Sequence, residues 1–280
     1  MASPLLDVDW SGCERSVIPV DGADLACWHR PADSATDRWI LWLHGACGSH
    51  LMWGHQLEAF PDANHLFLDV RAQGESTLAP GRRVAFADVL DDLGHVLDHY
   101  GAEQAVIVGH SWGGNPAQEF WFRNPDRVEG LVLVGAWGQL RPMTEAELGR
   151  IRLMTKAYRI VPWSLASRFS GKACSSVPDT QAVITKTVRE SGRDVFLDLG
   201  LSAYEEVHEV DAYPAATPTL LVRGDQDYPK ALAPIYADIR AKNPAAVEVV
   251  IPGTKHMPMV DTPSAFDGAL RDFLDTLPTR

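Results

Sequence analysis

The sequence predicts an α/β protein whose mainly parallel sheet of eight strands is covered by helices on both faces. Short, nearly continuous apolar runs at 38–44, 104–109 and 128–135 are typical of strands buried on both faces. Amphipathic segments of helical period separate such runs, and this strand–helix alternation favours a parallel sheet. The 280 residues are 46% hydrophobic and 22% charged, as expected of a soluble globular chain.

The chain opens on two predicted strands joined at Asp21-Gly22, a hairpin-type turn. The helix expected after the strand at 104–109 ends before Pro125, since proline cannot continue a helix. The predicted strands are 16–20, 23–29, 38–44, 65–70, 104–109, 128–135, 217–224 and 246–253. The predicted helices between and after them are 86–100, 112–124, 231–241 and 264–277.

Residues 140–212 contain no run typical of a buried strand. Thr144 and Glu147 have the spacing of a capping box, and apolar residues of helical period follow them. We therefore expect a helical lid at 140–212 inserted into one core domain that comprises 1–139 and 213–280. Ligands of open α/β sheets bind at the carboxyl edge of the strands, where such a lid would lie.

Charge and cysteine usage exclude several classes of function. The net charge of −12 argues against nucleic acid and anionic membrane surfaces as partners, because both attract basic proteins. No stretch approaches 18 consecutive apolar residues, and the N-terminus has no apolar run of signal length. The four cysteines form no C-x-x-C pair and are expected to be reduced thiols of a cytoplasmic protein.

The most informative motif is Gly109-His110-Ser111-Trp112-Gly113, which lies between a predicted strand and a predicted helix. G-x-S-x-G in this context is a nucleophile elbow, a strained turn that exposes the serine hydroxyl at the edge of the sheet. Small residues are needed around the serine because side chains would collide with the adjoining strand and helix. Ser111 is therefore the predicted nucleophile.

A serine hydroxyl needs a base to take its proton, and in this architecture the acid and then the histidine follow the serine along the chain. His208 and His256 lie beyond Ser111, and His256 is favoured because it follows the last strand whereas His208 falls in the expected lid. Asp225 and Asp227 both follow the preceding strand. Sequence physics alone leaves the choice between these two carboxylates open.

Taken together, these motifs resemble the α/β-hydrolase fold family in its lid-bearing branch. The resemblance comprises His44-Gly45, the segment 69–76, the elbow, 223–227 and 254–256. It implies Asp227 as the acid, in the last place of G-x-x-D. It also implies an oxyanion hole formed by the backbone N–H groups of Trp112 and of Ala46, with Cys47 as the alternative to Ala46. Ala72 stands where the family commonly has glycine.

The resemblance further implies a cofactor-independent serine esterase that acts on a carboxylic ester, lactone or related acyl substrate through an acyl-enzyme. Relatives that open epoxides carry aspartate at the nucleophile position, so serine disfavours that activity. The alternatives are hydrolysis of a C–C bond in a ring-cleavage product and a ligand receptor with vestigial activity. The sequence leaves the oligomeric state open.

The expected substrate is a small apolar or aromatic acyl compound, because tryptophans flank the predicted site. Trp137 and Cys47 are the candidate substrate contacts, although the small, apolar character of Cys47 favours a buried filler over a contact with substrate. His95 and His99 stand one helical turn apart, but they lie off the apolar stripe of their helix. No metal site and no cofactor is therefore expected.

Overall fold

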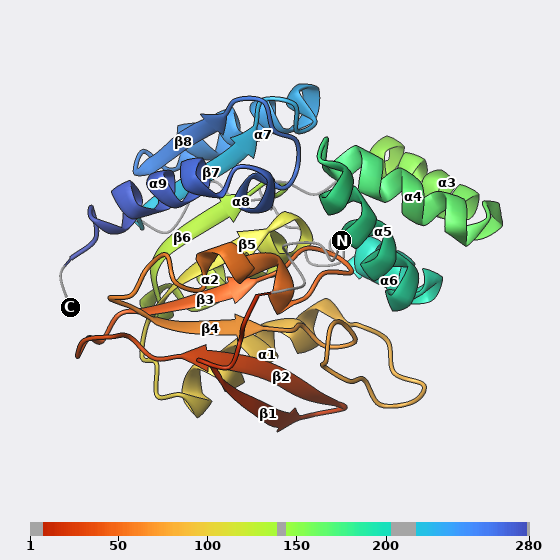
Figure 1. Ribbon diagram of the computed structural model, residues 1–280. Helices are drawn as coiled ribbons and strands as arrows, with labels where there is room; N and C mark the ends of the chain where they lie inside the picture. Colours follow the sequence, from red (N-terminus) through yellow and green to blue (C-terminus); the bar gives the residue numbers. More distant parts are fainter. Residues whose placement is uncertain (1–7, 139–143, 203–216, 279–280) are drawn as a thin grey trace.

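The computed structural model describes residues 8–138, 144–202 and 217–278. Its centre is an eight-stranded sheet in the order β1-β2-β4-β3-β5-β6-β7-β8 (Figure 1). Strand β2 pairs antiparallel with both β1 and β4, and all other neighbours pair in parallel. The strands are β1 (Glu14–Val20), β2 (Ala23–Arg30), β3 (Trp39–Leu43), β4 (Asn64–Leu68), β5 (Ala105–His110), β6 (Val128–Val134), β7 (Thr219–Gly224) and β8 (Ala246–Ile251).

The α-helices of the described chain fall into two groups. Those that pack on the sheet are α1 (Phe86–His99), α2 (Gly114–Arg123), α7 (Pro229–Lys242), α8 (Pro258–Asp261) and α9 (Pro263–Leu274). Those between β6 and β7 are α3 (Glu145–Ile160), α4 (Trp163–Cys174), α5 (Pro178–Ser191) and α6 (Arg193–Ser202). Short 3-10 helices are η1 (His50–Gln56), η2 (Ser111–Gly113) and η3 (Pro125–Arg127). Sequence analysis did not predict η1 or α8.

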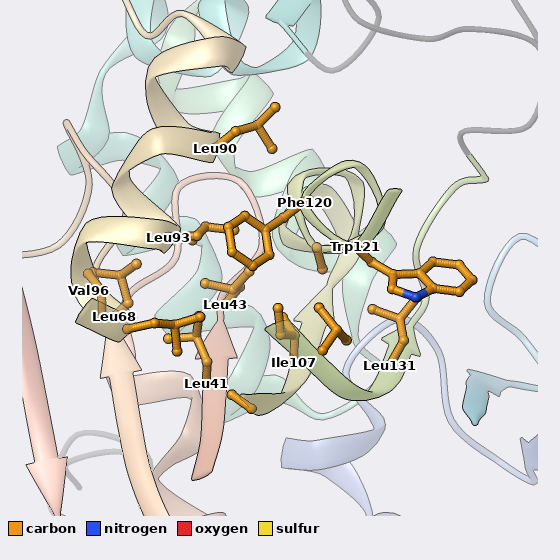
Figure 2. Close-up of a cluster of buried hydrophobic side chains, with 14 of the residues drawn as sticks. Leu41, Leu43, Leu68, Leu90, Leu93, Val96, Ile107, Phe120, Trp121 and Leu131 are labelled. Carbon is orange, nitrogen blue, oxygen red and sulfur yellow. The ribbon is translucent and has the colours of Figure 1, made fainter. Parts of the chain in front are cut away.

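The two faces of the sheet form separate cores because strand side chains alternate. Leu41 and Leu43 of β3 point to the face covered by α1, α2 and α7, and Figure 2 shows Leu43 beside Leu93 and Phe120. Ile40 and Trp42 point to the opposite face, which η1, α8 and α9 cover. The prediction of an α/β fold with helices on both faces is thus confirmed.

In the described part of 140–212, the chain forms helices and no strand, and these helices lie at one end of the sheet (Figure 1). The expected lid boundaries at 140 and 212, and His208 with them, lie outside the described residues. Among the described residues, we find no helix that combines the length and the hydropathy needed to cross a bilayer.

Candidate active site

The elbow forms a sharp turn between β5 and α2. Ser111 has a φ of +51°, in the left-handed region that non-glycine residues rarely occupy. A methyl group at Gly109 would lie 2.6 Å from Cα of Gly114, and one at Gly113 would lie 2.5 Å from the carbonyl oxygen of His44. Both contacts are too short for carbon, so the turn requires glycine on both sides of the serine.

Ser111, His256 and Asp227 form a continuous hydrogen-bonded chain. Nε2 of His256 lies 2.8 Å from Oγ of Ser111, and Nδ1 lies 2.9 Å from Oδ1 of Asp227. Asp227 follows β7 and His256 follows β8, so parallel strands bring both side chains to the same edge as the elbow. The buried Asp227 carboxylate accepts a hydrogen bond from the Nδ1–H group, which leaves the Nε2 lone pair facing the serine hydroxyl.

The two aspartates that the sequence left open have different partners. Oδ1 of Asp225 accepts a hydrogen bond from the backbone N–H of Gly253 at 2.9 Å, and its side chain is exposed. Asp227 is 1% exposed and contacts the imidazole. The geometry therefore gives Asp225 a role in the turn and puts Asp227 in position to orient His256.

The segment after β3 lies beside the elbow, where an oxyanion would form. His44 is fully buried: its Nε2 accepts a hydrogen bond from Val70 N–H, and its Nδ1 donates one to the carbonyl of Gly45. A methyl group at Gly45 would lie 3.1 Å from Cβ of Ser111, so this loop touches the nucleophile. Both hydrogen bonds of His44 therefore hold the backbone of neighbouring segments in place.

The two alternative donors in this loop are not equivalent. The backbone N–H of Cys47 donates to Oε1 of Gln73 at 2.6 Å and is occupied. The N–H of Ala46 has no acceptor among the described residues. Trp112 N–H lies in the first turn of η2, where helical N–H groups have no intrahelical partner. Neither the Ala46 N–H nor the Trp112 N–H thus has a hydrogen-bond acceptor among the described residues, and their role as the oxyanion donors stays a prediction.

Sequence reasoning missed His110, which supports the backbone of His256. Nε2 of His110 donates to the carbonyl oxygen of His256 at 2.8 Å. Burial holds the pKa of His110 well below its usual value, so the ring is neutral. The N–H of His256 in turn donates to the carbonyl of Cys174 at the end of α4. Both backbone groups of His256 are thus fixed, and no local pattern in the sequence indicated either contact.

Gly135 is a second residue that sequence reasoning missed. It follows β6 with a φ of +59°, and a methyl group there would lie 2.7 Å from Oδ2 of Asp227 and 2.9 Å from Nδ1 of His256. Only glycine leaves room for the carboxylate–imidazole pair. Gly135 ends the apolar run 128–135, and a glycine at that place in the sequence indicates the end of a strand and not a site residue.

The two expected substrate contacts have different surroundings. The Cys47 side chain is 1% exposed in an apolar cluster with Val70 and Trp112, and burial raises the pKa of its thiol to about 12. These are the surroundings of a small packing residue, and its expected substrate contact stays a prediction. Trp137 is 37% exposed, three residues beyond β6, and its substrate contact stays a prediction.

One cavity of about 70 Å³ borders the elbow. Gly45 and His110 form its wall toward Ser111, and Val183, Ile184 and Thr187 of α5 close it from the other side. The lining is mainly apolar. Among the described residues, we find no cluster of side chains suited to hold a metal ion.

Comparison with known proteins identifies the family of this chain. Residues 40–269 match the model of the alpha/beta hydrolase family, and the chain belongs to that family. It is 28% identical over 252 residues to an sn-1-specific diacylglycerol lipase of Mus musculus, covering 84% of this chain and 80% of the lipase. It is 36% identical over 110 residues to epoxide hydrolase B of Mycobacterium tuberculosis, covering 37% of this chain.

The match spans 31% of that epoxide hydrolase, about a third of its length. Among solved structures, a hydrolase from Pseudomonas aeruginosa superimposes with a TM-score of 0.78 at 23% identity, covering 95% of this chain and 99% of that one. This likeness shows the fold. Membership of the family supports the expectation of a hydrolytic enzyme.

Proposed function

We propose that the protein is a cofactor-independent serine hydrolase that cleaves a carboxylic ester or lactone through an acyl-enzyme. The observation that carries this proposal is the hydrogen-bonded chain from Ser111 through His256 to Asp227, with contacts of 2.8 Å and 2.9 Å. A hydroxyl alone is a weak nucleophile, and an imidazole in this position removes its proton as it attacks.

The proposed reaction begins with attack of Ser111 Oγ on the ester carbonyl while Nε2 of His256 takes the hydroxyl proton. The N–H groups of Ala46 and Trp112 bind the oxyanion of the tetrahedral intermediate. His256 then gives its proton to the leaving alkoxide, which departs as the alcohol. Water attacks the acyl-enzyme with His256 again as base, and the acid leaves as Ser111 regains its proton. Asp227 stabilises the imidazolium in both halves.

The residue at the nucleophile position distinguishes ester from epoxide hydrolysis. Attack of the Ser111 hydroxyl on an epoxide carbon would form an ether, which has no carbonyl for water to attack. The enzyme would be alkylated once and would not turn over. An acyl-serine has such a carbonyl, so acyl transfer is the chemistry that Ser111 supports, although one relative is named an epoxide hydrolase.

We also propose that α3–α6 form the lid predicted for 140–212. Two contacts join α4 to the loop that carries His256. His256 N–H donates to the carbonyl of Cys174, and Nζ of Lys255 donates to the carbonyl of Lys172. Residues of α5 close the cavity beside the elbow. The helices therefore contact the site, as a lid that selects substrates must.

Burst kinetics with p-nitrophenyl acetate test the proposal. Wild-type protein should release about one equivalent of nitrophenol in a fast phase, followed by slower turnover. Ser111→Ala should abolish both phases, and the control Ser164→Ala, at an exposed position of α4, should leave them unchanged. Equal turnover by Ser111→Ala and wild type would overturn the proposal.

A further inference from the structure

The outer helices α3 and α4 expose an unusual amount of apolar side chain. Leu153 and Ile160 of α3 are 69% and 85% exposed, and Leu165 and Phe169 of α4 are 59% and 64% exposed. Single exposed apolar residues are normal, but a contiguous group marks a surface that binds something. In Figure 1 these two helices lie at the outer side of the helical group, and the C-terminal end of α4 contacts the loop after β8.

A cavity of about 550 Å³ opens between these two helices. Ala157, Tyr158 and Val161 line it from the α3 side, and Leu165 and Phe169 line it from α4. This lining is almost entirely apolar, and the volume is that of a site for a small organic ligand or part of a larger one.

Basic side chains border the apolar lining. Arg168 and Lys172 stand at the cavity on the same face of α4 as Leu165 and Phe169, because these positions recur at intervals of three and four residues. Both are exposed and have no ion-pair partner among the described residues. On α3, Lys156 is exposed as well. The face thus combines an apolar centre with a cationic border.

This cationic face belongs to an acidic protein. Residues 145–202 carry nine Lys and Arg against six Asp and Glu, whereas the remaining residues carry 16 against 31. The net charge of −12 therefore conceals a helical region of opposite sign. The expectation that anionic membranes do not bind the protein rests on the net charge of the whole chain. That net charge does not describe the charge of this face.

We propose that the α3–α4 face docks the protein onto an anionic lipid surface. Exposed Leu, Ile and Phe side chains beside Lys and Arg are the combination by which amphipathic helices bind such surfaces. The apolar side chains enter the acyl region, and Arg168 and Lys172 lie at the level of the anionic headgroups. A second copy is a poorer occupant, since a two-fold contact would bring the same cations of both copies together. This docking does not depend on the proposed hydrolytic activity.

Cosedimentation with sucrose-loaded vesicles tests the proposal, using the full chain with Ser111→Ala so that the lipid stays intact. Vesicles of equal parts phosphatidylglycerol and phosphatidylcholine should bind the protein at least about tenfold more tightly than pure phosphatidylcholine, and salt should weaken the binding. Equal binding to both, or no binding to the anionic vesicles, overturns the proposal.

Paired variants locate the surface. Arg168→Gln with Lys172→Gln should weaken binding about 25-fold, since each charge contributes about fivefold. The control pair Arg15→Gln with Arg82→Gln makes the same change in net charge on the core and should retain binding. Leu165→Ser with Phe169→Ser should also weaken binding, whereas Val17→Ser with Val247→Ser, at exposed apolar positions of the sheet, should not.

Circular dichroism and thermal unfolding check that each variant is folded. If the core variants lose binding as much as the α4 variants, the proposed face is wrong. Sedimentation velocity tests the alternative that a second copy of the chain occupies this face. A dimer that the double variant Leu165→Ser with Phe169→Ser converts to a monomer would assign the face to a second copy, and that result would also overturn the proposal.

Discussion

Nδ1 of His256 lies 2.9 Å from Oδ1 of Asp227, in a contact that is closed to solvent on the aspartate side. This pair fixes the tautomer in which Nε2 faces Ser111. Asparagine at 227 would present an N–H to Nδ1 and favour the opposite tautomer. We expect Asp227→Asn to lower kcat by about 10⁴ with the fold intact.

Asp225→Asn is the matched control for this change, because it alters the same group two residues away. It should leave kcat within about threefold of wild type, since the Asp225 carboxylate accepts a hydrogen bond from the Gly253 N–H and has no other side-chain partner in the described part of the chain. Steady-state kinetics on one soluble ester compare the two variants. Equal losses from both variants would contradict the assignment of Asp227.

Gly135→Ala should damage the site without touching any reacting atom. The added methyl group would lie 2.7 Å from Oδ2 of Asp227 and displace the carboxylate from His256. The φ of +59° adds about 1–2 kcal/mol of backbone strain. We expect kcat to fall at least about 10²-fold and the free energy of unfolding to decrease.

Gly268→Ala is the control for the glycine change. A methyl group at this helical position meets nothing within 4 Å, so the substitution should raise the free energy of unfolding by up to about 1 kcal/mol and leave kcat unchanged. Kinetics and urea unfolding report both effects. Wild-type kcat in Gly135→Ala would show that the carboxylate tolerates displacement.

Arg71 and Asp92 form a buried, two-point ion pair, with contacts of 2.7 Å from Nε and 2.6 Å from Nη2. Arg71→Met would leave the Asp92 carboxylate buried without this partner, so we expect a loss of about 3–5 kcal/mol in the free energy of unfolding. Arg15→Met, which breaks the exposed pair with Glu75, should cost less than about 1 kcal/mol. Urea unfolding distinguishes the two, and equal losses would contradict this account of burial.

His65 should make stability depend on pH. Burial lowers the pKa of its imidazole to about 4, while the unfolded chain protonates it near the ordinary value of about 6.5. The unfolded state therefore binds the proton first, and stability falls as pH decreases from about 6.5 to 4, by roughly 3 kcal/mol from this residue.

Unfolding in urea at a series of pH values measures that dependence. His65→Gln can still accept from Trp42 and donate to the Phe60 carbonyl, and it should flatten the curve over this range. The exposed control His99→Gln should leave the curve unchanged. A curve of wild-type slope in His65→Gln would contradict the assignment.

The fold and the elbow could be predicted because both have local signals. Buried strands appear as apolar runs, and G-x-S-x-G needs glycines at fixed offsets from Ser111. Gly135 and His110 gave no such signal, because their roles arise from segments that meet only in space. The choice between Asp225 and Asp227 also depends on a contact in space, because it is decided by which of the two carboxylates faces His256. The basic face of α4 was missed because net charge averages over the chain.

The central claim is that His256 activates Ser111 as a nucleophile. Its most direct test is the rate of labelling by a fluorophosphonate, with the modified residue identified by mass spectrometry. We expect one phosphonyl group per wild-type chain, on Ser111, and labelling slower by about 10³-fold or more in His256→Ala. Labelling of Ser111 at the same rate in both proteins, or stable modification of another residue instead, would contradict the account.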